Sequence, residues 1–325
     1  MTRIQPPRRG ILVSAALTAC FLCAFSPGNA GDALPGGQAE TPSAPRFFFE
    51  SGINPALDSL LSSGGSILVK PRINDQEVGW FLLDPGVEGM RIHASLAEAL
   101  ELAASGTHRL IATSKSEERR TWLCSAFQLG PCRAERLELT EMTSNPEEET
   151  GEPVLGVVGT ALLRSVVAEI EPGTGAVRLY DPSIYADRPA DWREFRLANS
   201  LPVVNCRFEG DREGEFGLDL RSPLGVVFFR PAVEALGFLR NKVTRPGTIS
   251  GQNFGKASVR TGVLEWFETA GFRREKVRAV FLTEDVLAAS TAGLTGLLGR
   301  DALGKGVLVL DYQRQRLAVM PGEAE

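Results

Sequence analysis

The chain has 325 residues, of which 43% are hydrophobic and 23% are charged, and its formal net charge is −5. This length suits one large domain or two domains of ordinary size. An acidic chain without basic stripes argues against nucleic acid and anionic membrane surfaces as partners.

The first thirty residues have the organisation of a secretory signal peptide. Basic residues precede an apolar run from Ile11 to Phe25, and the small residues Gly28 and Ala30 follow it. The run is shorter than the stretch of about 20 apolar residues that a membrane-spanning helix needs. We therefore predict that residues 1–30 are cleaved, and that the protein is exported to the periplasm or secreted without an integral membrane span.

Two other interpretations of this segment stay open. The pair Arg8 and Arg9 resembles a twin-arginine export signal, and residues 17–20 (LTAC) resemble a lipobox that would make Cys20 a lipid attachment site. Because the apolar run continues past Cys20, plain cleavage is the favoured interpretation. Residues 31–45, rich in Gly, Ala and Pro, are predicted to be a flexible linker.

The remaining chain contains two copies of one pattern. Residues 67–73 align with residues 202–208 at an offset of 135, and the same offset places Asp84 on Asp219. Further segments match in the same order, namely 97–102 with 233–238, 157–159 with 297–299, and 177–179 with 317–319. Several matches in one order indicate a tandem duplication.

Each copy predicts the same succession of elements. An apolar strand leads into a polar turn, and a second strand ends on an aspartate. A short helix follows, indicated by the spacing of Leu96, Leu100 and Ala103 in the first copy and of Val233 and Leu236 in the second. Further strands run to an apolar-apolar-Gly step, and a last strand closes the copy. Many short strands with Gly and Pro turns predict an all-β barrel or sandwich.

This succession, together with GVVGTALL at residues 156–163 and LLGRDAL at residues 297–303, resembles the retropepsin-like and pepsin-like aspartic proteases. The resemblance spans residues 66–182 and 201–321. It implies a bilobal β-barrel fold with few short helices. The implied division is an N-terminal lobe at 46–182, an inter-lobe linker at 183–200 and a C-terminal lobe at 201–325.

The resemblance also implies a site. In that family each lobe contributes one aspartate to a cleft between the lobes, which makes Asp84 and Asp219 the candidate catalytic dyad. The glycines of the apolar-apolar-Gly steps, Gly159 and Gly299, would support the aspartate loops. Two carboxylates held close share one proton, so that one can deprotonate water while the other polarises a peptide carbonyl.

The residues beside the dyad depart from the family's Asp-Thr-Gly. The first lobe has Asp84 followed by Pro85 and Gly86, and the second has Asp219 followed by Leu220 and Arg221. Both hydroxyls that tie the two loops together are lost. A guanidinium directed at Asp219 would hold it as an anion and lower its pKa. We favour a degenerate protein that binds an extended peptide in the cleft; the alternative is an active endopeptidase that uses both aspartates.

A glycine-rich segment of the second copy, residues 248–255, is typical of a hairpin that covers a cleft, with Ile249, Gly251 and Phe254 as candidate flap residues. An ordinary surface hairpin is the alternative. The corresponding segment of the first copy, residues 114–120, is charged and is predicted to be a solvated turn.

Cys124 and Cys132 flank a turn-like segment and are predicted to form a disulfide across a hairpin in an oxidising compartment, with two unpaired thiols as the alternative. Cys206 is then the odd cysteine, expected to be a small buried residue. His93 and His108 are the only histidines and lack metal-ligand spacing. We therefore predict no metal, no cofactor and a monomer whose partner is an extended peptide or protein segment.

Overall fold

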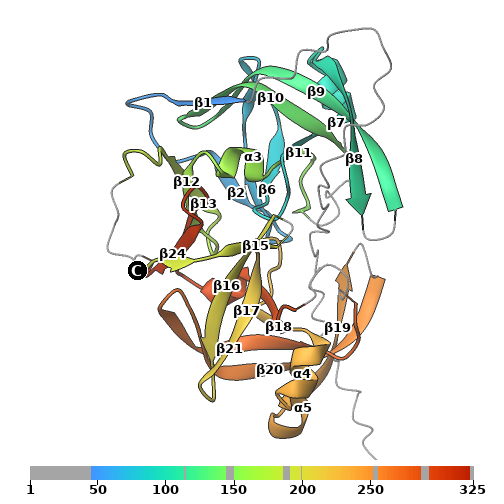
Figure 1. Ribbon diagram of the computed structural model, residues 1–325, viewed down its shortest axis with the longest axis vertical. Helices are drawn as coiled ribbons and strands as arrows, with labels where there is room; N and C mark the ends of the chain where they lie inside the picture. Colours follow the sequence, from blue (N-terminus) through green and yellow to red (C-terminus); the bar gives the residue numbers. More distant parts are fainter. Residues whose placement is uncertain are drawn as a thin grey trace, which may run out of the picture.

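The computed structural model describes residues 45–112, 115–143, 150–185, 191–198, 200–251, 255–286 and 293–322. The predicted signal peptide and all but the last residue of the predicted linker lie outside the described residues. Figure 1 shows two β-rich lobes, one in blue to green and the other in yellow to red. The prediction of an all-β, two-lobed chain with few short helices is confirmed. None of the described helices is long and apolar enough to cross a membrane.

The first lobe is built on an 11-stranded sheet. In some of its strands apolar and polar residues alternate, and in others the residues are apolar throughout. These strands bury Phe81, Phe127 and Ile92 in the core. The strands are β1 (Arg46–Phe49), β2 (Ser59–Leu61), β3 (Ile67–Val69), β4 (Arg72–Ile73), β5 (Gln76–Glu77), β6 (Trp80–Leu83), β7 (Met90–His93), β8 (Ala103–Ala112), β9 (Lys115–Leu129), β10 (Cys132–Met142) and β11 (Val154–Val158). The helices are α1 (Ala94–Ala99) and α3 (Thr160–Leu163).

The second lobe is built on an 8-stranded sheet. The strands are β15 (Arg196–Ala198), β16 (Leu201–Phe208), β17 (Arg212–Asp219), β18 (Val226–Phe228), β19 (Arg245–Gly251), β20 (Gly255–Thr269), β21 (Phe272–Leu282) and β22 (Gly296–Gly299). The helices are α4 (Arg230–Ala235), α5 (Phe238–Asn241) and α6 (Arg300–Leu303). A cluster of phenylalanine rings that includes Phe208, Phe228 and Phe281 fills the core of this lobe.

In both lobes, the strand of the apolar-apolar-Gly step lies between the strand before the aspartate and the strand after it. In the first lobe, β11 pairs in parallel with β6 and antiparallel with β7. In the second lobe, β22 pairs in parallel with β17 and antiparallel with β18. The internal repeat in the sequence therefore corresponds to a repeat in strand topology.

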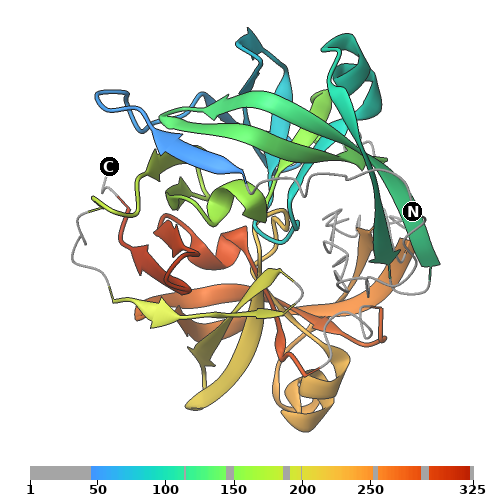
Figure 2. The same ribbon diagram turned by 45° about the horizontal axis from the view of Figure 1, so that its top comes forward.

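A third sheet of five strands joins the two halves of the chain. Its order is β13 (Ala176–Tyr180), β12 (Val167–Glu171), β23 (Val307–Asp311), β24 (Arg316–Met320) and β14 (Arg193–Glu194). The antiparallel pairing of β12 with β23 links the first half directly to the second, and Figure 2 shows these green and red strands together. The segment 183–200, predicted as a linker, contributes β14 and β15 to two of the sheets.

The predicted helices are present but shorter than the apolar spacing suggested. α1 ends at Ala99, and Ala103 is the first residue of β8. Glu101, between them, has a φ of 51°, a left-handed conformation that cannot continue a helix.

The predicted disulfide is wrong. Cys124 and Cys132 are free and buried, and burial raises their pKa to about 11 and about 12. In the β9–β10 hairpin, Cys132 lies opposite Leu129 and Cys124 lies opposite Leu137. The two cysteines are therefore five positions apart along the strands, or about 17 Å at about 3.4 Å per residue, whereas a disulfide needs a Cα separation of about 4.4–6.8 Å. Cys206 is free and buried as expected.

Candidate functional site

Asp84 and Asp219 occupy equivalent places at the ends of two strands. Asp84 directly follows β6, and Asp219 is the last residue of β17. Both residues are buried. The backbone N–H of Gly86 donates to Asp84 Oδ1 at 2.9 Å, and the N–H of Arg221 donates to Asp219 Oδ1 at 3.1 Å. The same backbone hydrogen bond therefore forms in both lobes, although glycine stands at one position and arginine at the other.

The two glycines proposed as supports lie where no side chain could fit. A Cβ on Gly159 would lie 2.3 Å from the carbonyl oxygen of Val87, and a Cβ on Gly299 would lie 2.3 Å from that of Leu224. Val87 and Leu224 belong to the loops that follow the two aspartates. Because each glycine lacks a Cβ, its backbone can pack directly against the loop that follows the aspartate of the same lobe.

The carboxylates influence one another. Burial, followed by the negative charge of Asp84, raises the pKa of Asp219 to about 7, and the nearby Arg221 lowers it by less. No described group forms a hydrogen bond with the buried Oδ2 of Asp219. Below about pH 7, Asp219 is therefore protonated.

Arg221 reaches across to the other lobe. Its Nη1 lies 3.7 Å from Asp84 Oδ2, and the two side chains are only 12% and 5% exposed. Arg221 was expected to lower the pKa of Asp219, but the pKa of Asp219 is raised overall. The positive charge does favour the anion, but the burial of Asp219 and the charge of Asp84 outweigh it.

The other two dyad neighbours face different surroundings. Pro85 has no N–H, but its carbonyl oxygen accepts a hydrogen bond of 2.7 Å from Tyr312 Oη. Leu220 is buried in the main hydrophobic core. The residue after the aspartate thus makes a carbonyl contact in one lobe and an apolar core contact in the other.

Tyr312 and Arg300 are residues of the site that sequence reasoning missed. Tyr312 follows β23, and its pKa is raised well above the ordinary value by burial and then by the charge of Asp84. Arg300 Nη1 donates to the carbonyl oxygen of Pro172 at 2.9 Å. Burial lowers the pKa of Arg300, and the charges of Asp219 and Asp301 oppose that. Both bonds connect the first half of the chain with the second.

A sequence signal existed for only one of these residues. Arg300 stands inside the LLGRDAL motif, directly after Gly299. Tyr312 follows a strand and precedes a turn far from either aspartate, and no feature of that stretch indicates a contact with Pro85.

Each lobe carries a long hairpin, and the two lie on the same side of the molecule (Figure 2). In the second lobe, β19 and β20 pair from Gly251 and Gly255 down to Arg245 and Thr261. Of the candidate flap residues, Ile249 is buried, Gly251 ends β19, and Phe254 lies outside the described residues. In the first lobe, the segment predicted as a solvated turn is mostly strand, because β9 begins at Lys115 and pairs with β8.

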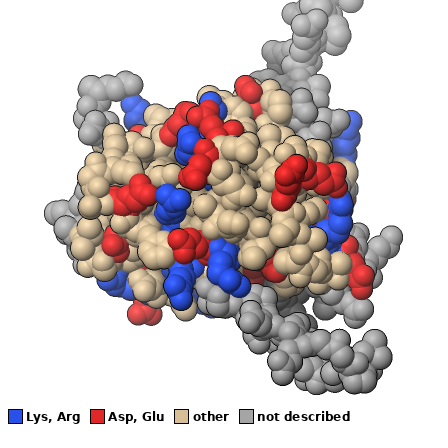
Figure 3. Space-filling model, turned by 90° about the horizontal axis from the view of Figure 1, so that it is seen from above, with Lys and Arg blue, Asp and Glu red and all other residues tan. Residues whose placement is uncertain are grey.

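Charged groups elsewhere are distributed without a single dominant sign on the face shown in Figure 3. His108 Nε2 lies 2.5 Å from Glu138 Oε1 at the surface of the first lobe. Among the described residues, no group of three or more His, Cys, Asp and Glu side chains is arranged to hold a metal ion.

Part of the first lobe matches a known family model. Residues 69–161 match the model of a family described as aspartyl protease. The search of curated proteins gave no match. Among solved structures, the aspartic proteinase from Irpex lacteus aligns with a TM-score of 0.48 and 14% identity, over 84% of this chain and 97% of that chain.

Proposed function

The chain is aspartic-protease-like, and on that premise we propose that it is an exported monomer whose inter-lobe groove binds an extended peptide without cleaving it. The observation that carries the proposal is the position of Arg221, whose Nη1 lies 3.7 Å from Asp84 Oδ2 although Arg221 belongs to the loop that follows Asp219.

A water-activating dyad needs one carboxylate to act as a base. An ion pair at about 4 Å is worth about 4 kcal/mol at an effective dielectric constant of about 20, before the cost of desolvation. The Asp84 carboxylate is instead engaged in this ion pair with Arg221. The guanidinium also occupies space beside the Asp84 carboxylate, where a water and a peptide carbonyl would have to meet.

The fold supports a peptide as the ligand. Two lobes contribute equivalent loops to one site, and two long hairpins lie on one side of the molecule. Strand-like backbone hydrogen bonds hold an extended chain in such settings. Because both lobes come from one chain, the groove is complete in a monomer.

The test is incubation of the wild-type protein with a random-sequence peptide library between acidic and neutral pH, followed by mass spectrometry. We expect retained peptides and no cleavage products. The combined substitutions Pro85→Thr, Leu220→Thr and Arg221→Gly, which restore Asp-Thr-Gly in both lobes, should introduce weak cleavage that Asp84→Asn abolishes. Strong wild-type cleavage that is lost in Asp84→Asn or in Asp219→Asn would overturn the proposal.

Cleavage by the wild type that depends on these aspartates would indicate the second candidate function, an active aspartic endopeptidase. The raised pKa of Asp219, about 7, favours it, because a carboxyl that keeps its proton up to that pH can serve as the acid that hydrolysis requires. An enzyme of this kind should lose activity as the pH rises through about 7, when Asp219 loses its proton.

Export rests on the sequence of residues 1–30. Fusing these residues to a phosphatase that is active only outside the cytoplasm should give an active reporter. If Arg8→Lys with Arg9→Lys abolishes export, the route is the twin-arginine one, and if export persists, the signal is a general secretory one. An inactive reporter fused to the unchanged segment would contradict export.

A further inference from the structure

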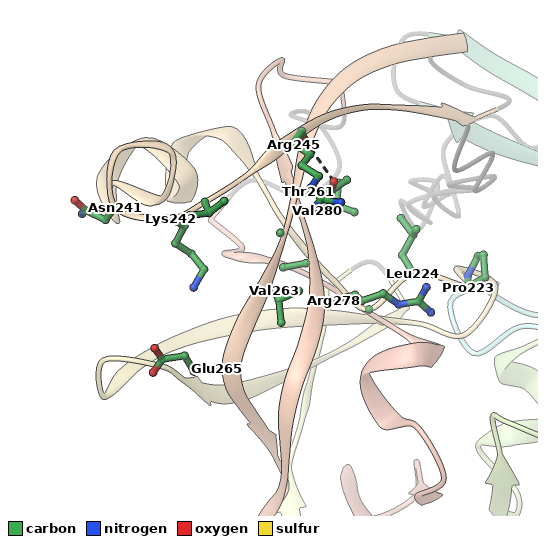
Figure 4. A pocket seen from close by; sticks show the side chains of 14 residues that line it. Pro223, Leu224, Asn241, Lys242, Arg245, Thr261, Val263, Glu265, Arg278 and Val280 are labelled. Atoms are coloured by element: carbon green, nitrogen blue, oxygen red, sulfur yellow. Dashed lines mark hydrogen bonds between the residues drawn. The ribbon is translucent and has the colours of Figure 1, made fainter. Parts of the chain in front are cut away.

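A cavity of about 920 Å³ opens on the second lobe (Figure 4). Leu224 and Val280 line it and are buried, at 8% and 6% exposed. Val263 and Val243 also line it, and they are 49% and 92% exposed. Covering exposed apolar surface is favourable because it removes that surface from water. The cavity therefore favours an apolar group that covers both exposed valines.

The same cavity lies at a gap in the sheet. β19 pairs with β20 as far as Thr261, and β16 pairs with β20 from Phe267 onward. Between them, Glu209 bonds to the backbone of residues 265 and 266. Residues 262–264 therefore have no strand on that side in the described part of the chain, while β21 pairs with them on the other side. An interrupted sheet edge of this kind accepts an added extended segment.

The charges beside the cavity are unequal. Lys242 is held by Glu209 at 2.6 Å, and Arg278 is held by Asp301 at 3.0 Å. Arg245, where β19 begins, forms no ion pair with any of the described residues, and Figure 4 shows it beside Thr261. Glu265 is the acidic residue among those that line the cavity. A carboxylate entering beside Arg245 would meet a cation that its own chain leaves available.

We propose that this cavity is a second peptide-docking site, separate from the groove that holds Asp84 and Asp219. An extended segment adds to β20 at residues 262–264, inserts an apolar side chain between Val263 and Val280, and places an acidic residue beside Arg245. The sheet edge selects a peptide over a lipid, because a fatty acid has no backbone groups to pair with residues 262–264.

The experiment is selection of a displayed random-sequence peptide library against the full protein. The wild type should enrich sequences in which an apolar residue stands close to Asp or Glu. Val263→Glu places a charge in the apolar mouth and should weaken binding of the selected peptides at least tenfold. Arg245→Glu should reverse the charge preference from acidic to basic residues. Ile184→Glu changes an apolar side chain that is 80% exposed elsewhere on the surface, and it should leave binding unchanged.

The outcomes separate this site from the inter-lobe groove. Thermal unfolding of each variant checks that it is folded. Binding that survives Asp219→Asn but fails in Val263→Glu supports the docking site. Binding that fails in Asp219→Asn but survives in Val263→Glu places the peptide in the groove and overturns the inference. A final arm adds an environment-sensitive fluorescent dye to the wild type and then oleate. If the selection enriches no peptide and oleate displaces the dye, the cavity takes a lipid and the inference is overturned.

Discussion

At the scale of single residues, the two aspartates keep their backbone contacts while their surroundings have diverged. Gly86 and Arg221 both donate a backbone N–H to the carboxylate two positions earlier. That hydrogen bond depends on the backbone conformation of the loop, and it does not require a glycine at the donating position. Arginine at this position therefore keeps the backbone contact to Asp219 and adds a cation beside Asp84.

The pKa of Asp219 predicts how stability depends on pH. The unfolded chain releases this proton near pH 4, whereas the folded protein retains it until about pH 7. Between these values the folded state binds more protons, so its stability falls as the pH rises, by about 1.4 kcal/mol per pH unit at most. Urea unfolding at a series of pH values should show this loss in the wild type and not in Asp219→Asn.

A second variant tests the cause. Asp84→Asn removes the negative charge that raises the pKa of Asp219, so the window of lost stability should end at a lower pH. If the wild type and Asp219→Asn have parallel pH profiles, burial does not raise this pKa in the folded protein.

At the scale of strands, the sequence predicted which elements exist better than how they are aligned. The two-residue connection between Leu129 and Cys132 fixes the register of the β9–β10 hairpin, and that register separates Cys124 from Cys132. Sequence spacing suggested facing cysteines because it could not locate the turn to the residue. The polarity of the charged stretch after Lys115 predicts a turn, and it conceals the pairing of this stretch with β8.

The same limit applies to the site. The repeat in the sequence identified both aspartates and both glycines, because local patterns recur around them. The direction of Arg221 depends on a rotamer chosen by the other lobe, and the bond from Tyr312 to Pro85 joins residues 227 positions apart. Contacts of this kind arise from the assembled fold and leave no local pattern.

At the scale of the whole molecule, the lobes are joined by a shared sheet as well as by side chains. β12 from the first half pairs with β23 from the second, and Tyr312 connects the end of β23 to the loop beside Asp84. Interfaces formed by a continuous sheet are hard to separate without breaking both sides. The two lobes should therefore unfold together.

The substitution Tyr312→Phe tests this coupling. It leaves the buried carbonyl oxygen of Pro85 without its hydroxyl partner, which should lower the free energy of unfolding by about 1–3 kcal/mol. Fluorescence from Trp122 in the first lobe and Trp266 in the second, each observed in a protein whose other tryptophans are replaced by Phe, reports the lobes separately. In the wild type the two transitions should coincide, and Tyr312→Phe should move both to lower urea by the same amount. Two separate transitions in the wild type, or a shift confined to one tryptophan, would mean that the shared sheet and Tyr312 do not couple the lobes.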